Sequence, residues 1–496
     1  MALLRDPREQ GVLKPTLGLF TAITLIVGSM IGSGIFALPA AMMGLLQNAW
    51  LLVLVWIVGG IITICGALVL AELAGMIPRA GGTYQFIKEG MGRHFGFLYG
   101  WTFFWVVQTG IIAAVAVAFG NFTRRLFGFD FIWVPAVAVG CIIFLSVVNY
   151  LGAKFGGRVQ DIFTVAKVIA LLALVLLGFL IGRPTHATFG AEVQGAPSGF
   201  ELLSAFFSAM LLGLFAMDGW PQAAYVAPEI KNPTRTVPRA LLLGVASVIV
   251  VYVLATLAYV YLLPVERILE INNSRGVLVI ASEAAAVFSG ETGARLISAA
   301  VMVSTFGTVN AFILTSPRIF YAVAEDGMFP KAFRRLNPKT NVPTFAIAVI
   351  GTWSGLLVCL SRFSLDAYSA LVGAVTFCIF LFYLPMVASY FILRRTRPNA
   401  ARPYRTHFHP VVPIIFTVGA IIVVVNGLTV DIMTVINAMR GTNPLTSTEV
   451  AGLTGLWGTV MTLAGVPVLL YWRARGARGE KTPLRGEPFA RPLPES

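Results

Sequence analysis

Charged residues are scarce in this chain of 496 residues: Asp, Glu, Lys and Arg make up 12% of it, against 57% hydrophobic residues. A water-soluble fold of this length cannot keep so much apolar surface out of water. The four cysteines lie in apolar runs, without the spacing of a disulfide framework or a metal site. The four histidines form no HExxH motif and no nucleophile arrangement accompanies them. We therefore expect no metal, no cofactor and no catalytic residue.

Long apolar runs recur along the whole sequence instead. A membrane-spanning helix needs roughly 20 such residues to cross a hydrocarbon core of about 30 Å, and it must satisfy its backbone hydrogen bonds internally. The pattern predicts an all-α integral membrane protein with about twelve transmembrane helices. They are expected near 17–44, 48–76, 94–123, 131–150, 160–182, 201–228, 238–264, 291–322, 343–361, 366–394, 410–430 and 451–472.

Basic residues alternate between the two sides of this predicted bundle. Of the 36 Lys and Arg residues, 27 fall in the termini and in every second loop, 8 fall in the other loops, and Lys167 lies inside a helix. Since basic loops face the cytoplasm, both termini are expected there, in a multi-pass protein of the cell membrane. The net charge of +14 then reflects topology and attraction to anionic membrane lipid rather than a nucleic-acid partner.

The first predicted helix contains VGSMIGSGIFALP, residues 27–39, with glycines at 28, 32 and 34. Each glycine weakens a helix by about 1 kcal/mol relative to alanine, so this stretch favours an unwound segment in mid-membrane. The Gly28–Gly32 spacing also fits a close helix-packing seam. This stretch alone leaves both interpretations open.

The sixth predicted helix carries Asp218, Gly219 and Pro221 inside an apolar span. Proline and glycine interrupt a helix, and a carboxylate at membrane depth needs a cavity or a partner. Two interrupted helices five helices apart are typical of an inverted repeat with a ligand site between its halves. Free amides of a half-helix suit a carboxylate and free carbonyls suit an ammonium group, so an α-amino acid fits.

Lys167, in the fifth predicted helix, has two interpretations. It reaches along its stem to the membrane surface, or it is an internal cation at the place where a sodium-coupled transporter would bind Na⁺. In the second case it connects the fifth helix to the first and to a polar patch on the eighth, formed by Ser304, Thr305, Thr308 and Asn310.

Five motifs resemble the amino acid–polyamine–organocation transporters, specifically their L-type amino acid transporter branch of prokaryotic type. They are VGSMIGSGIFALP, AELAGMIPRAGGTYQFI, VQDIFTVAKVIALL, FAMDGWPQAAYVAPEIKNPTRTVPRA and VSTFGTVNAFILTSPRIFYAVAEDGMFP, in this order along the chain. The resemblance implies a LeuT-like fold, a 5+5 inverted repeat with helices 1 and 6 unwound and two peripheral helices. The implied parts are repeats at 17–182 and 201–394 and peripheral helices at 410–472. They leave a cytoplasmic N-terminus at 1–16 and a cytoplasmic tail at 473–496, whose Pro, Arg and Gly content predicts disorder.

The resemblance also implies the site. The substrate-binding residues would be Ser29, Met30, Ile31, Gly32, Ser33, Gly34, Phe215, Ala216 and Asp218. The amides from 29 to 34 would hold the carboxylate, with Ser33 and Gly34 nearest, and the carbonyls of Met30, Ile31, Phe215 and Ala216 would hold the amine, with Phe215 as an aromatic gate. Lys167, with Ser304 and Thr305, would replace the sodium of coupled relatives.

Some positions depart from the family pattern or stay open. Met217 and Pro221 differ from common family residues, which leaves the side-chain pocket undefined, and Asp218 either contacts a cationic substrate, accepts protons or caps the broken helix. Arg79 and Lys231 are candidates for an inner gate beside the carboxylates Glu72 and Glu229. With Gln108 and Asn149, these two carboxylates are otherwise expected at helix ends or in interhelical hydrogen bonds.

The loop 120–131 contains no cysteine, so no disulfide-linked heavy chain is expected. The sequence predicts a sodium-independent exchanger of neutral L-amino acids. A proton-coupled amino acid symporter and a membrane sensor that binds amino acids without transporting them remain alternatives.

Overall fold

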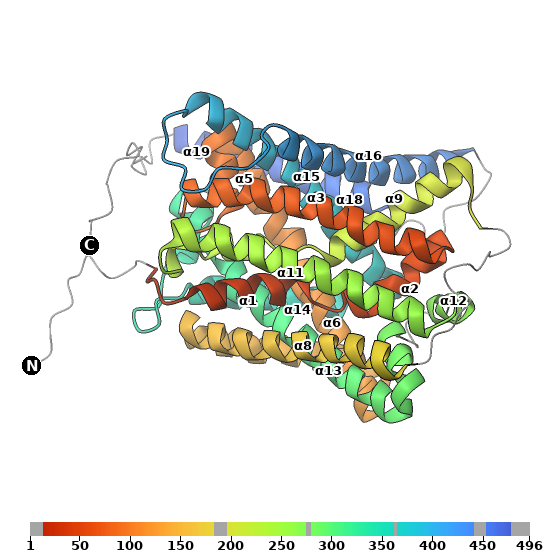
Figure 1. Cartoon of the computed structure of the whole chain (residues 1–496). Coiled ribbons are helices and arrows are strands. Elements are labelled where there is room, and N and C mark those ends of the chain that lie inside the picture. Colours follow the sequence, from red (N-terminus) through yellow and green to blue (C-terminus); the bar gives the residue numbers. More distant parts are fainter. Residues whose placement is uncertain (1–12, 183–195, 274–278, 362–364, 441–452, 478–496) are drawn as a thin grey trace, which may run out of the picture.

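The computed structural model describes residues 13–182, 196–273, 279–361, 365–440 and 453–477 (Figure 1). Within these ranges the chain is almost entirely helical, and the only extended pairing is one isolated bridge between Leu17 and Ile230. The long helices lie side by side along a common direction. Eleven of the described spans are long and apolar enough to cross a membrane, and Thr344–Leu360 is a shorter apolar helix.

The helices follow one another with short connections. The first five spans are α1 (Leu19–Met30) with α2 (Gly34–Leu46), α3 (Ala49–Met76), α5 (Arg93–Thr102) continuing through a π-helical turn into α6 (Gln108–Phe127), α7 (Val134–Tyr150) and α8 (Ala153–Ile181). The next five are α9 (Gly199–Ala216) with α10 (Gln222–Tyr225), α11 (Pro233–Leu262), α13 (Ile280–Glu325), α14 (Thr344–Ser361) and α15 (Leu365–Thr396). The last are α16 (Val411–Met439) and α18 (Thr454–Leu463) with α19 (Gly465–Ala477).

The predicted all-α fold with about twelve spans is confirmed, as are the interruptions in the first and sixth. Three boundaries differ by seven residues or more. α8 begins seven residues before the predicted 160, and α16 ends nine residues after the predicted 430. α13 begins eleven residues before the predicted 291, on the far side of a kink at Gly290. The first turns of α8 carry Lys154 and Arg158, and their charge lowers the hydropathy there. The apolar run that predicts the helix therefore begins later than the helix itself.

Two helices outside the spans escaped prediction. α4 (Thr83–Met91) and α12 (Val265–Asn273) have nine residues each. Both are amphipathic and lie between spans, where short helices and loops look alike in sequence. The tail predicted to be disordered from residue 473 begins later, because α19 continues to Ala477. The rest of that tail and residues 1–12 lie outside the described residues.

Each of the first four spans packs on the span five places later. α2 contacts α9, α1 contacts α10, α3 contacts α11, α6 contacts α13 and α7 contacts α14. Pairing of this kind is what a two-fold axis between two repeats produces. It places the interruption of the first span directly against that of the sixth.

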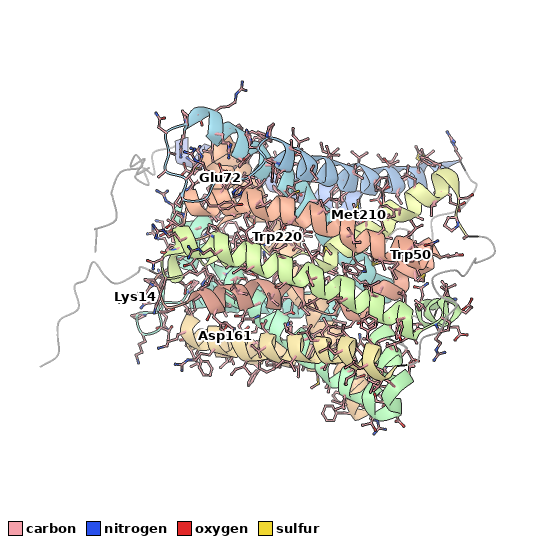
Figure 2. All side chains as sticks on the ribbon, in the orientation of Figure 1. Lys14, Trp50, Glu72, Asp161, Met210 and Trp220 are labelled. Carbon is pink, nitrogen blue, oxygen red and sulfur yellow. The ribbon has the colours of Figure 1, made fainter. Side chains whose placement is uncertain are left out.

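The two ends of the bundle differ in charge. Lys14 and Glu72 lie at one end and Trp50 at the other, with Trp220 between them (Figure 2). The first end, called the basic end below, also carries α4 and the segments 327–343 and 397–410. Ion pairs connect them: Lys88 to Asp326 at 2.8 Å and Arg397 to Glu89 at 2.9 Å.

Candidate functional site

The first span is interrupted between Met30 and Gly34. Ile31 has φ −77° and ψ 84°, which ends α1, and α2 restarts after Ser33. Within the described part of the chain, the amides of Ser33, Gly34 and Ile35 donate no hydrogen bond. These amides form the start of α2, where the helix dipole is positive. The break therefore presents a ready anion-binding end at mid-membrane.

The second interruption lies between Ala216 and Gln222, and Gly219 makes it possible. Its φ of +108° is a conformation that other residues rarely adopt. A Cβ there would lie 2.8 Å from both the carbonyl carbon and the Cβ of Ser29. On the other side, a Cβ on Gly34 would lie 2.7 Å from the Cβ of Ala216. The two breaks thus touch through two glycines.

Tyr252 of α11 joins the two breaks. Its hydroxyl lies 2.7 Å from the carbonyl oxygen of Met30 and 3.0 Å from that of Ala216. Its fully buried ring packs edge-on against Trp56, with ring centroids 5.2 Å apart. One hydroxyl has one hydrogen, so it satisfies one carbonyl at a time and leaves the other for a second donor. Tyr252 was not predicted, because one tyrosine in an apolar helix has no distinguishing spacing.

Lys167 is completely buried, so the interpretation that it reaches the membrane surface is wrong. Its ammonium nitrogen lies 3.0 Å from the Gly28 carbonyl oxygen, 2.7 Å from that of Ile31 and 2.7 Å from that of Ser304. The Thr308 hydroxyl lies 3.0 Å away. Four oxygens from α1, its break and α13 surround the cation, which compensates for its loss of water.

Two expected residues have other roles than predicted. Among the described residues, the Thr305 hydroxyl bonds only within its own helix, to the carbonyls of Val301 and Met302 at 2.9 Å each. Thr308 takes the place beside Lys167 that was expected for Thr305. The Ile31 carbonyl already accepts bonds from Lys167, from Ser304 at 3.0 Å and from Thr308 at 3.1 Å. The Ile31 carbonyl therefore belongs to the lysine site rather than to the substrate site. The sequence does not show which side chains point toward this carbonyl, so it could not assign the role.

Asp218 and Phe215 border the second break, and both side chains are partly exposed. The Asp218 amide bonds the Phe215 carbonyl at 3.1 Å, which closes the end of α9. An Asp218 carboxylate oxygen accepts a hydrogen bond of 2.5 Å from the Tyr383 hydroxyl of α15. Among the described residues, this carboxylate forms no ion pair. Tyr383 was not predicted, because its helix is distant in sequence.

At the basic end, the carboxylates Glu72 and Glu229, beside the gate candidates Arg79 and Lys231, form ion pairs with other bases. Glu229 pairs with Arg318 of α13, through N–O distances of 2.7 and 3.0 Å with both side chains almost fully buried. Glu72 pairs with Arg394 at 2.6 Å and with Arg402 at 3.2 Å. These arginines lie more than 80 residues from their partners, so proximity along the chain does not reveal the pairs.

Backbone bonds close the basic end further. The amides of Thr16 and Leu17 both lie 2.8 Å from the Glu229 carbonyl oxygen, and the Lys231 amide bonds the Leu17 carbonyl at 2.8 Å. Glu229 thereby ties the start of α1 and the end of the second break to α13. The expected interhelical roles of Gln108 and Asn149 are confirmed by bonds to Ser316 and Asn310, at 2.7 and 2.9 Å.

Comparison with known proteins gives consistent similarities. The family model described as amino acid permease matches residues 17–470. The chain is 30% identical to the serine/threonine exchanger SteT of Bacillus subtilis (strain 168), over 95% of this chain and 99% of the relative. It is 34% identical to the human large neutral amino acids transporter small subunit 2 (82% and 74%) and 27% identical to the human b(0,+)-type amino acid transporter 1 (85% and 84%).

Replacing Gly219 by Ala should loosen the contact between the breaks. The new Cβ meets Ser29 and occupies an unfavourable φ, so we expect a loss of about 1–3 kcal/mol in stability. Thermal unfolding in detergent measures the effect. The control is Gly140→Ala in α7, where a Cβ would meet nothing within 4 Å; equal midpoints for the two variants would contradict the proposed contact.

Replacing Glu229 by Ala leaves Arg318 buried without its partner, which costs about 3–5 kcal/mol. Glu291→Ala breaks the exposed pair with Arg295, whose side chains are 71–78% exposed, and should change stability by less than about 1 kcal/mol. Adding Arg318→Met to Glu229→Ala should restore much of the loss. A double variant no more stable than the single one would refute the charge explanation.

Proposed function

This chain belongs to the amino acid permease family, in the L-type-like branch of the amino acid–polyamine–organocation superfamily, and we propose that it exchanges neutral L-amino acids by alternating access without sodium. The observation that carries the proposal is the pair of facing breaks, with free amides on one side and carbonyls on the other. The names of its relatives, a serine/threonine exchanger and a large neutral amino acids transporter, support this substrate class.

The proposed binding mode follows from the charges of a zwitterion. The carboxylate lies on the amides of Ser33, Gly34 and Ile35, at the positive end of α2. The ammonium group donates to the Met30 or Ala216 carbonyl, whichever Tyr252 does not bond. The Met30 carbonyl also accepts the Gly32 amide at 2.9 Å, which favours Ala216. Phe215, partly exposed beside the break, closes over the bound substrate. Because backbone groups hold the part common to all amino acids, side-chain preference comes from the surrounding pocket.

Lys167 explains independence from sodium in this proposal. Carbonyl and hydroxyl oxygens of Gly28, Ile31, Ser304 and Thr308 form a set suited to a hard cation. The lysine ammonium occupies that set permanently. A fixed cation stabilises the break without an ion gradient, which is compatible with exchange driven by substrate alone.

Proton-coupled symport is the second candidate, and Asp218 favours it. This carboxylate lies at the break and is held by a neutral phenol rather than by a base. A proton or a cationic substrate would compensate for its charge. The two functions differ in whether a pH gradient drives net uptake.

We further propose that residues 17–182 and 201–394 form two inverted repeats with 410–472 peripheral to them. In this topology the basic end faces the cytoplasm, as the distribution of Lys and Arg predicts. The loop 120–131 offers no cysteine for a disulfide to a second subunit. The closed basic end then corresponds to a state whose cytoplasmic path is shut.

Proteoliposomes test the exchange directly. Uptake of labelled serine or leucine should require unlabelled neutral amino acid inside, because the empty carrier returns poorly, and it should not require Na⁺. An imposed pH gradient without internal substrate is the control. Strong uptake in that control would replace exchange by proton coupling, and no uptake of any amino acid would reject both.

Lys167→Ala removes the cation from the set of four oxygens and leaves three carbonyls without this donor. We expect exchange to fall at least tenfold, since one buried charge-assisted bond contributes about 1.5–3 kcal/mol and several are lost. Thr305→Ala, whose hydroxyl bonds only its own helix, is the matched control and should retain exchange. Similar rates for the two variants would show that Lys167 has no such role.

A further inference from the structure

A groove outside the central site opens between α7 and α14. It has a volume of about 720 Å³ and is lined by the residues Val139, Ile142, Ile143, Ser146, Val147, Tyr150, Thr344, Ile347, Ala348, Gly351, Thr352, Gly355, Leu356 and Cys359. Ile143, Val147 and Leu356 are 49–59% exposed. In a membrane-spanning bundle, such exposed apolar side chains face lipid. The groove is therefore an apolar slot on the lipid-facing surface.

Small residues of α14 line the groove and leave space between the two helices. Ala348, Gly351 and Gly355 recur at three- and four-residue spacing, on one face of the helix. A Cβ on Gly351 would meet the Ser146 hydroxyl at 2.8 Å, whereas one on Gly355 would lie 3.9 Å from Val139. The buried Ser146 hydroxyl has no hydrogen-bond partner in the described structure. A larger side chain at 355 would fill the slot without a backbone clash.

One end of the groove lies against segment 327–343 of the basic end. Tyr150, its last residue on α7, accepts a bond of 3.3 Å from the Asn337 side chain, and Asn337 accepts one of 2.9 Å from the Lys339 amide. Segment 327–343 contains four basic residues and no acidic one. Lys339 and Lys154, just beyond Tyr150 along the chain, are exposed and form no ion pair among the described residues.

We propose that this groove binds one anionic phospholipid, with an acyl chain between α7 and α14 and its phosphate between Lys154 and Lys339. The apolar slot and the uncompensated bases at its end match the two halves of such a lipid. The proposal concerns a surface separate from the substrate site and does not depend on which amino acid is carried.

Length favours a lipid chain over a helix of a second copy. From Val139 to Tyr150 the slot runs about 17 Å, from the rise of 1.5 Å per residue. This is little more than half of a hydrocarbon core of about 30 Å, so it matches the chain of one leaflet. A transmembrane helix of a second copy would need a groove that crosses the whole hydrocarbon core. The exposed lysines lie at one end of the groove, which matches the single headgroup of one lipid.

Native mass spectrometry of the purified protein tests the proposal, with titration of phosphatidylglycerol or phosphatidylcholine into the detergent solution. Wild type should retain one phosphatidylglycerol in preference to phosphatidylcholine. Lys154→Gln with Lys339→Gln should weaken retention of phosphatidylglycerol about 30-fold, from the usual contribution of two bases near a charged headgroup. Gly355→Leu fills the slot and should weaken retention of both lipids.

Matched variants control for charge and bulk. Arg235→Gln with Arg239→Gln removes two exposed bases at the start of α11, and Gly140→Leu adds a leucine on α7 away from the slot; both should retain lipid like wild type. Equal phosphatidylglycerol retention by the Lys154/Lys339 variant and its control overturns the proposal. So does a Gly355→Leu variant that keeps its lipid but has fewer copies per particle than wild type, since the face would then be a contact between copies.

Discussion

The buried ammonium of Lys167 is the interaction on which the centre of this protein depends. A helix that stops in mid-membrane exposes carbonyls that lipid cannot satisfy, and the Gly28 and Ile31 carbonyls at the end of α1 are such groups. Lys167 bonds both and also the Ser304 carbonyl. One side chain thus makes the interruption of the first span stable and holds it against α8 and α13. Without an internal cation, this break would need an ion from solution.

The second interruption is stabilised by its contacts with the first. Gly219 and Gly34 remove the side chains that would separate the breaks, and Tyr252 shares its hydroxyl between carbonyls of both. Three helices therefore meet at one point with little side-chain volume between them. The backbone groups left over are the amides of Ser33, Gly34 and Ile35 on one side and a carbonyl on the other. A site made from backbone recognises what all amino acids share.

Charge connects this centre to the basic end. The Glu229–Arg318 pair is desolvated, and breaking it leaves a buried charge, so it is made or broken as a unit. The Glu229 carbonyl also accepts hydrogen bonds from the amides of Thr16 and Leu17, just before α1. Movement of α1 away from this end consequently has to disturb the residues around a buried ion pair. In the proposed alternating access, that pair resists opening toward the cytoplasm until substrate binding changes the balance.

Hydropathy and composition alone determined that this chain spans the membrane about twelve times, and glycine, proline and aspartate in apolar runs located both breaks. These features are local: a helix must satisfy its own backbone, so its interruption is visible in its own residues. The pairing of side chains was decided only in the tertiary structure. Thr308 rather than Thr305 faces Lys167, Arg318 rather than Lys231 meets Glu229, and Tyr252 and Tyr383 reach the breaks from distant helices. Such contacts depend on helix rotation and neighbours, and a single sequence does not encode either in any local pattern.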